Sequence, residues 1–280
     1  MSSINPMADA NWEGSAGQYD AFEKKWHYYA RVAERLLAPL EIKPGSRALE
    51  LASGTGACTS LLSRLCGDGE VVSVERSPAM VAMARGNMEA LGLENVAFVN
   101  GDVAHLSALV AGMERFDYAV CNSAFWQFPE PEAVARAVAG ALKPGGRFAF
   151  NIPALVSFRR ERGALRATVN GILEKHGIDS RKFWRVRRRL DFRAILEGAG
   201  LEVLRDTHYY VGMTAAQGRE WRRIPVFSRR WGNYSSLPPE VSAEVLEAVR
   251  RARPRDRDRR SRWRMIVAGR SSGRRPLSVK

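Results

Sequence analysis

The sequence contains little cysteine and no long apolar segment. Its 280 residues include three cysteines, Cys58, Cys66 and Cys121, whose scattered spacing matches neither a disulfide framework nor a zinc-binding pair. No apolar run approaches the ~18–20 residues needed to cross a bilayer. The N-terminal residues lack the basic region and apolar core of a secretory signal. We therefore expect a cytoplasmic protein without a metal site, in which Cys58 is a small buried thiol rather than a nucleophile.

Acidic residues are scarce in the second half of the chain. Residues 1–150 hold 13 Lys and Arg against 17 Asp and Glu, whereas residues 151–280 hold 31 against 13. The net charge of +14 therefore belongs to the second half alone, where nearly all the basic residues are arginine. This asymmetry indicates either an anionic partner (phosphate, carboxylate, nucleic acid or a membrane surface) or an arginine-rich face exposed to solvent.

Short apolar segments alternate with amphipathic ones through most of the chain. The predicted strands cover 48–51, 71–75, 96–102, 116–122 and 147–153, and the predicted helices between them cover 55–66, 77–92 and 131–146. A further helix and a sixth strand fill 191–211, and residues 262–270 supply a seventh. The alternation predicts an α/β, doubly wound, Rossmann-like fold with a seven-stranded, mostly parallel sheet and helical lid insertions.

The domain organisation follows from this pattern. We expect an N-terminal helical lid at 1–44, with a helix at 26–40, and a cofactor-binding core at 45–153. A basic helical insertion at 154–190 precedes the continuation of the core at 191–212. A helical, basic cap at 213–261 precedes the last strand and a frayed tail at 262–280.

The stretch LELASGTGACTS (49–60) places a glycine loop after the first predicted strand. A nucleotide-triphosphate loop needs Lys and then Ser or Thr after its second glycine, but Gly56 is followed by Ala57. A dinucleotide fold prefers a third glycine where this sequence has Thr59. Taken alone, the loop excludes a nucleoside triphosphatase and leaves the cofactor open.

Polar residues also end each of the next strands. Glu50 ends the first predicted strand, Glu75 the second, Asp102 the third and Asn122 the fourth. In an open parallel sheet, ligands bind beyond the carboxyl ends of the strands. A carboxylate at the end of the second strand can accept both hydroxyl groups of a ribose. The four positions together therefore predict a nucleoside-containing ligand.

The ordered set of motifs resembles a known family. LELASGTG (49–56), VVSVERSPAMVAMAR (71–85), NGD (100–102), the segment from FDYAVCN to LKPGGRF (116–148) and AILEGAGLEV (194–203) are similar to those of class I S-adenosylmethionine-dependent methyltransferases. The small-molecule group that includes the ubiquinone and menaquinone biosynthesis enzymes is the most similar in style. The resemblance covers roughly residues 45–205 and implies S-adenosyl-L-methionine as the cofactor.

The resemblance also implies roles for individual residues. The segment from Ala52 through Ser53 and Gly54 to Gly56 would surround the methionine part of the cofactor, with Ala52 where the family usually has glycine. The other positions that the resemblance or the motif context assigns to the cofactor are Tyr19 in a closing segment, Glu50 orienting the loop, Glu75 on the ribose with Arg76 beside it, Asp102 and Val103 at the adenine, and Asn122 near the methyl group.

Substrate-contacting residues are expected from the N-terminal helix, the loop after the fourth strand and the insertions. Phe125, Trp126 and Phe128 could line an apolar pocket or pack beneath the next helix, and Trp26 belongs to the expected lid. His27 is a candidate general base on that lid, and a surface or core role is its alternative. His208, with Tyr209, has the same two interpretations.

The sequence therefore favours an enzyme that methylates a small, anionic or aromatic metabolite by in-line transfer, since orientation of the reacting groups contributes much of such catalysis. Arginines recur beside aromatic residues at 158–162, 185–189, 219–223, 228–231 and 253–264, and one or two of them would bind the anion. The sequence Asn-Ser-Ala-Phe (122–125) lacks the Asp/Asn-Pro-Pro-Tyr/Phe motif of adenine and glutamine methylation. An RNA methyltransferase using the basic half, which we do not favour, and a non-catalytic protein of the same fold remain the alternatives.

Overall fold

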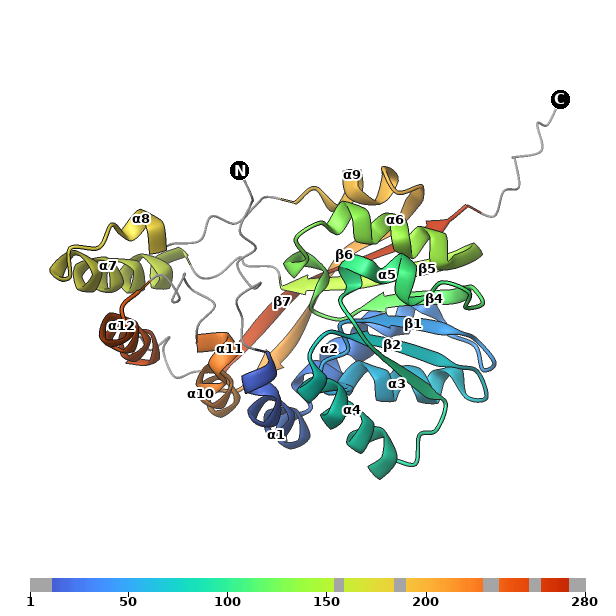
Figure 1. Ribbon diagram of the computed structural model, residues 1–280, viewed down its shortest axis with the longest axis horizontal. Coiled ribbons are helices and arrows are strands. Elements are labelled where there is room, and N and C mark those ends of the chain that lie inside the picture. Colours follow the sequence, from blue (N-terminus) through green and yellow to red (C-terminus); the bar gives the residue numbers. More distant parts are fainter. Residues whose placement is uncertain (1–11, 154–158, 184–189, 229–236, 252–257, 272–280) are drawn as a thin grey trace.

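The computed structural model describes residues 12–153, 159–183, 190–228, 237–251 and 258–271. Within them, seven strands form one sheet in the order β3-β2-β1-β4-β5-β7-β6 (Figure 1). Strands β1 to β5 pair in parallel, and β7 runs antiparallel to both β5 and β6. The predicted seven-stranded, mostly parallel α/β fold is therefore confirmed. The strands are β1 (Ala48–Leu51), β2 (Val71–Glu75), β3 (Val96–Asn100), β4 (Phe116–Cys121), β5 (Leu142–Pro153), β6 (Leu201–Met213) and β7 (Arg259–Arg270).

Helices cover both faces of this sheet (Figure 1). The α-helices are α1 (Ala16–Trp26), α2 (Tyr28–Leu37), α3 (Ala57–Cys66), α4 (Pro78–Ala90), α5 (Leu106–Leu109), α6 (Pro131–Ala141), α7 (Arg159–Lys175), α8 (Ser180–Phe183), α9 (Phe192–Glu197), α10 (Ala215–Arg223), α11 (Pro225–Ser228) and α12 (Pro239–Arg251). Short 3-10 turns are η1 (Glu13–Ser15), η2 (Ala38–Leu40), η3 (Val103–His105) and η4 (Phe125–Gln127).

Two apolar layers enclose the sheet. On one face, α5, α6 and α9 bury a cluster that includes Leu106, Val138 and Leu196 against the strands. On the other face, α2 and α3 bury Leu36 and Leu62. Because β1 is buried at every position, its ALEL segment carries no exposed polar face. The sheet order reverses between β1 and β4, and such a reversal opens a crevice beyond the carboxyl ends of the strands.

Two smaller clusters lie outside these layers. Helices α1, α2, α10 and α11 share one cluster, built around Phe22, Tyr29, Trp221 and Phe227, at the carboxyl edge of the sheet. Helices α7, α8 and α12 share the other, which includes Val169 and lies apart from the sheet (Figure 1). Residues far apart in the sequence thus form both units.

Some element boundaries differ from the predicted ones. The helix expected at 26–40 begins at Tyr28 as α2 and ends in η2, and a further helix, α1, precedes it; His27 adopts a left-handed conformation with φ 48° between α1 and α2. The carboxylate of Glu23 accepts hydrogen bonds from the backbone N–H groups of Tyr29 (2.9 Å) and Ala30 (2.8 Å). These bonds satisfy donors that the start of α2 would otherwise leave unpaired. The helix expected at 131–146 ends at Ala141, after which Leu142 pairs with Phe116 as part of β5.

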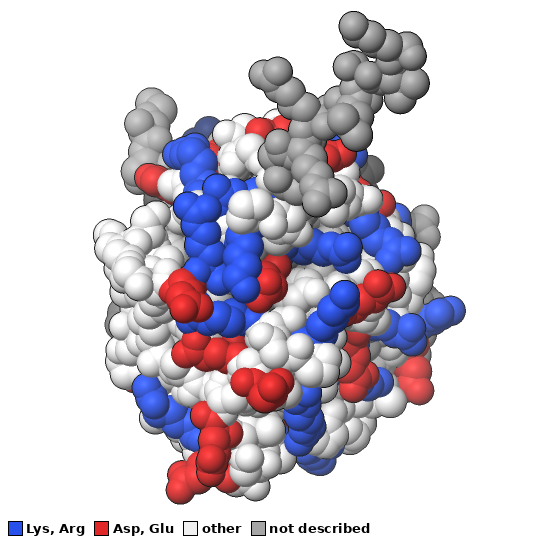
Figure 2. Space-filling view, turned by 90° about the vertical axis from the view of Figure 1, so that its right-hand side faces the viewer, with Lys and Arg blue, Asp and Glu red and all other residues white. Residues whose placement is uncertain are grey.

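Charge of both signs covers the face shown in Figure 2, where Lys and Arg alternate with Asp and Glu. Among the described residues, ion pairs such as Arg47–Glu70 and Lys143–Asp117 join opposite charges. The arginine-rich segment at 185–189 and most of 228–231 lie outside the described residues. None of the described helices is both long and apolar enough to cross a membrane.

Candidate active site

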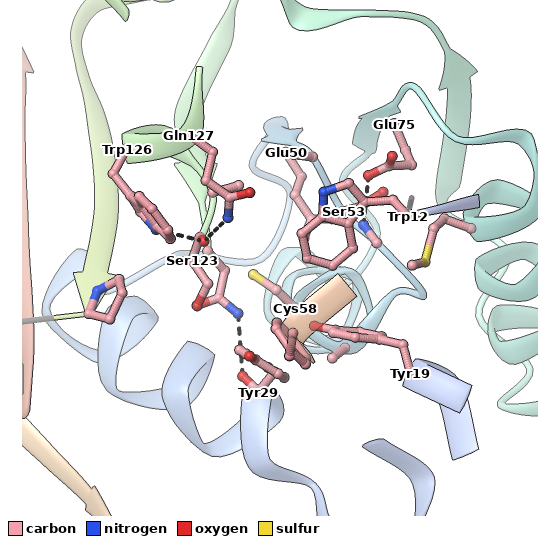
Figure 3. Close-up of a pocket in the computed structure, with 18 of the residues that line it drawn as sticks. Trp12, Tyr19, Tyr29, Glu50, Ser53, Cys58, Glu75, Ser123, Trp126 and Gln127 are labelled. Atoms are coloured by element: carbon pink, nitrogen blue, oxygen red, sulfur yellow. Dashed lines mark hydrogen bonds between the residues drawn. The ribbon is translucent and has the colours of Figure 1, made fainter. Parts of the chain in front are cut away.

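A cavity of about 250 Å³ opens beyond the carboxyl ends of β1, β2 and β4. Figure 3 shows Glu75 and Tyr19 on one side of it and Trp126 and Gln127 on the other. Helices α1, α2, α10 and α11 contribute aromatic side chains to the wall. The described lining residues that the sequence predicted are Tyr19, Glu50, Ala52, Ser53, Gly54, Glu75, Arg76, Asp102, Val103, Asn122, Trp126 and Phe128.

Glu75 is fixed at the end of β2 by two backbone amides. Gly54 donates its N–H to Oε2 (2.9 Å), and Ser77 donates its N–H to Oε1 (3.0 Å). Each carboxylate oxygen keeps a second lone pair, which can accept a ligand hydroxyl. Burial raises the pKa of Glu75, while the two amide hydrogen bonds oppose the rise. The glycine loop and the acidic residue thus form one preorganised acceptor group.

Glu50 lies beneath the loop and is almost fully buried. Its Oε2 accepts hydrogen bonds from the hydroxyl groups of Thr59 (2.6 Å) and Ser73 (3.2 Å), which join β1 to α3 and β2. Burial raises the pKa of Glu50 to about 7 despite these bonds. The buried thiol of Cys58 lies beside this carboxylate, and burial raises its pKa well above the usual value.

Left-handed backbone occurs both in the glycine loop and in the turn after β4. Ala52 (φ 55°) and Ser123 (φ 66°) adopt it without being glycine, and such conformations concentrate at functional sites. Gly56 (φ 93°) does not line the cavity, because it faces α4, where an added Cβ would lie 3.0 Å from Met88. Its glycine therefore serves close packing of the loop on α4.

Asn122 belongs to a hydrogen-bond network at the end of β4. The fully buried Asn151 donates from Nδ2 to Oδ1 of Asn122 (2.9 Å) and to the hydroxyl of Tyr209 (2.8 Å), and its Oδ1 accepts the Ser123 N–H (2.6 Å). The Tyr209 hydroxyl then donates to the carbonyl of Val32 (3.1 Å). The network fixes the turn after β4. The Tyr209 hydroxyl uses its hydrogen-bonding capacity within this network.

The structure does not bring the other predicted residues to the cavity. His27 is exposed at the α1–α2 junction, and His208 is exposed on β6. Trp26 donates its indole N–H to Glu220 on α10. Phe125 is fully buried against Phe150, with ring centroids 4.5 Å apart, so it packs in the core beneath the loop. The proposed general bases are thus separated from the cofactor side of the cavity.

Several lining residues were not singled out from the sequence. They come from segments distant from the glycine loop and include Trp12, Tyr29, Met80, Gln127, Trp221, Phe227 and Arg260 to Trp263. Tyr29 stacks on Tyr19 with centroids 5.3 Å apart, and its hydroxyl accepts the Trp221 indole N–H at 3.0 Å. The REWRR segment (219–223) stands out in the sequence for its arginines, but no local signal fixes the position of Trp221 at the cavity.

The residues present fit an S-adenosyl cofactor. The hydroxyl groups of Ser53 and Ser123 are buried at the edge of the cavity and have no hydrogen-bond partner among the described residues. Buried hydroxyl groups without partners cost about 1–3 kcal/mol each, so a polar ligand is expected to satisfy them. Glu75 offers acceptors for a diol on the same side. No three His, Cys, Asp or Glu side chains of the described residues cluster in a way that could hold a metal ion.

Comparisons with known proteins agree with this geometry. Residues 42–179 match the family model described as a methyltransferase domain. Demethylmenaquinone methyltransferase of Bacillus cytotoxicus is 30% identical over 125 residues, which are 43% of this chain and 52% of that protein. Protein-L-isoaspartate O-methyltransferase of Nitrobacter winogradskyi is 34% identical over 142 residues, which are 51% of this chain and 60% of that protein. The chain thus spans little more than half the length of these relatives.

Solved structures show the same fold at low identity. YcgJ protein from Bacillus subtilis has a TM-score of 0.56 at 16% identity, with 87% of this chain and 99% of that chain covered. Phosphoethanolamine N-methyltransferase 2 of Haemonchus contortus, solved with S-adenosylhomocysteine, has a TM-score of 0.54 at 13% identity, with 92% and 57% covered. Residues 42–179 thus match a methyltransferase domain in sequence, and the chain has the fold of these solved structures.

Proposed function

We propose that this protein transfers the methyl group of S-adenosylmethionine to a small molecule bound in the same cavity. The observation that carries the proposal is the Glu75 carboxylate, held by the amides of Gly54 and Ser77, at a cavity whose opposite side is aromatic. One side suits a ribose, and the other suits an apolar or aromatic substrate.

The cofactor would supply a methyl group that its sulfonium makes electrophilic. The chain's own residues would bind and orient it, with Glu75 at the ribose, Ala52 to Gly54 around the methionine part, and Asp102 with Val103 at the adenine. Asn122 lies between the two sides of the cavity, and its Oδ1 and Nδ2 are held by Asn151 and by the Tyr29 carbonyl. We assign it a positioning role near the reacting groups.

The cover over the cavity supports a small substrate. Trp221 and Phe227 stack with centroids 4.1 Å apart and an interplanar angle of 14°, and Tyr29 stacks on Tyr19 below them. The cover is thus packed aromatic structure from four helices, which would exclude water from a bound small molecule.

The test is methyl transfer from S-adenosylmethionine labelled in its methyl group. The purified chain is incubated with a panel of small aromatic and anionic acceptors and, separately, with total RNA, and binding of S-adenosylhomocysteine is measured by calorimetry. We expect cofactor binding and labelling of a small-molecule fraction. Labelling of RNA alone would favour the alternative substrate, and absence of cofactor binding would contradict the proposal.

A further inference from the structure

The first residues of β7 form part of the cavity wall. Because β7 runs antiparallel to β5, its beginning lies beside the end of β5, with Trp263 opposite Pro153. The segment from Arg260 to Trp263 therefore reaches the same edge as the ends of the parallel strands. Arg260, Ser261, Arg262 and Trp263 all line the cavity.

Two hydrogen-bond donors on this segment have no partner. The Trp263 side chain is only 5% exposed, and its Nε1 makes no hydrogen bond among the described residues. The Nε of Arg262 is likewise buried and unpaired there. Indole and guanidinium N–H groups donate and never accept, so only an acceptor atom can satisfy them. Leaving such donors buried and unpaired costs about 1–3 kcal/mol each, and a ligand oxygen would recover this free energy.

The two donors reach the cavity from opposite faces of the sheet. Consecutive side chains of a strand point to opposite faces. Trp263 packs in the α1–α2–α10–α11 cluster with Tyr29 and Trp221. Alternation assigns Arg262 to the other face with Arg264, whose guanidinium lies near the Phe192 ring of α9, yet Arg262 and Trp263 line the same cavity. The cavity thus extends across the edge of the sheet where β5 ends.

Charge divides the cavity into two sides. The carboxylates among the described lining residues are Glu50 on β1, Glu75 at the end of β2 and Asp102 after β3. The side formed by β7 carries Arg260 and Arg262 and, among the described lining residues, no carboxylate, whereas the single arginine on the other side, Arg76, lies beside Glu75. Attraction between opposite charges in a partly buried site therefore favours an anionic group on the β7 side.

The walls between these charges are flat and apolar. Trp126 and Phe128 follow β4, and Trp221 and Phe227 cover the cavity from α10 and α11. The Trp126 indole N–H is already used by the Ser123 carbonyl (3.1 Å), so its ring offers mainly an apolar surface. A planar ring with one anionic oxygen-bearing group matches both features.

We propose that the start of β7 is the subsite for the carboxylate of an aromatic acid, with Arg262 and Trp263 as the donors that select it. The inference rests on the proposed methyl transfer and names the substrate class for it. Arg262 supplies the charge, and Trp263 supplies a directed hydrogen bond. Both are specificity-determining residues rather than participants in the transfer.

The experiment uses the full chain saturated with S-adenosylhomocysteine and three probes that share a benzene ring: benzoate, benzyl alcohol and benzylammonium. Ligand-observed NMR titration gives each Kd. A hydrogen bond to a charged group contributes about 1.5–3 kcal/mol, so we expect benzoate to bind at least about tenfold more tightly than benzyl alcohol. Benzylammonium is expected to bind most weakly.

Three variants locate the effect. R262Q is expected to weaken benzoate binding by about tenfold or more and to leave benzyl alcohol binding unchanged. W263F keeps an aromatic ring but loses the indole N–H, and we expect it to weaken benzoate binding by roughly three- to tenfold. R205Q is the matched control, because Arg205 is exposed on β6 away from the cavity and loses the same charge. Circular dichroism melting checks that each variant folds. If W263F does not fold, R262Q alone still decides the test.

The outcomes separate this inference from the proposed function. Equal binding of benzoate and benzyl alcohol, no binding of any probe, or equal effects of R262Q and R205Q would overturn the subsite while S-adenosylhomocysteine still binds. Failure of the unmodified chain to bind S-adenosylhomocysteine would instead contradict the methyltransferase function itself.

Discussion

Glu75 allows a quantitative test of the cofactor site through the substitution E75Q. Glutamine has nearly the same shape but one oxygen fewer, so either the Gly54 or the Ser77 amide would face an NH₂ group instead of an acceptor. The variant also removes the charge that would strengthen two hydrogen bonds to ribose hydroxyls. Hydrogen bonds to charged groups contribute about 1.5–3 kcal/mol each. Taking the lower value for both gives a loss of about 3 kcal/mol, or roughly a hundredfold in Kd.

Isothermal titration calorimetry with S-adenosylhomocysteine measures this loss. E89Q is the matched control, because Glu89 lies exposed on α4. The ligand-free melting temperature of E75Q shows whether the loop still folds. A Kd within about threefold of the unmodified protein, in a folded variant, would refute the role given to Glu75.

The pH dependence of the same titration is an independent check. Burial raises the pKa of Glu75, so the ligand-free protein retains its proton to higher pH than an exposed glutamate would. Only the ionised form accepts on both oxygens. Affinity should therefore rise as pH increases through the raised pKa, and E75Q should lack that rise.

Three further predictions concern the fold around the site. Burial raises the pKa of Glu50 and of Glu23 to about 7, so the folded state binds more protons than the unfolded state between about pH 4.5 and 7. The free energy of unfolding, measured in urea, should therefore fall as pH rises through that window, by up to ~3 kcal/mol per group. E50Q should reduce this dependence on pH. G56A should lower the unfolding free energy by about 1–3 kcal/mol, measured in urea, since Gly56 has φ 93° and its added Cβ would meet Met88; an unchanged midpoint would contradict this packing. N151A should raise the Kd of the cofactor and lower the melting temperature by several degrees, because the side chain of the buried Asn151 makes three hydrogen bonds at the β4 turn. An unchanged Kd and an unchanged melting temperature would show the network to be dispensable.

The core of the fold could be predicted because its signals are local. The ALEL and VVSVE segments are apolar enough to be buried strands, and Pro78 after the Ser77 cap begins α4 where the sequence places it. A carboxylate also lies near or just beyond the end of each of the first three strands, so Glu50, Glu75 and Asp102 could be placed at one edge from topology alone. The three residues indeed line one cavity. Their assignment to the cofactor remains a prediction that E75Q tests.

The lid could not be predicted with the same detail, because its conformation depends on distant contacts. Nothing in the sequence near His27 marks a break, since a left-handed conformation is expected mainly at glycine. The break is stabilised by Glu23, whose carboxylate caps α2 only after the chain has turned. The turn leaves His27 exposed, which explains why a histidine on the predicted lid does not reach the cavity.

The other residues that line the cavity could not be placed from the sequence, because their positions depend on tertiary packing. Phe125 and Trp126 are neighbours with similar apolar character, yet η4 buries the first in the core and places the second on the cavity with its N–H bonded to Ser123. Arg262 and Trp263 likewise belong to a basic segment that resembles a solvated strand. Their position follows only from antiparallel pairing with β5, which carries the start of β7 to the edge where the parallel strands end. The half of the cavity that would hold the cofactor is thus encoded in short motifs, whereas the half that would select a substrate is encoded in the order and direction of the last two strands.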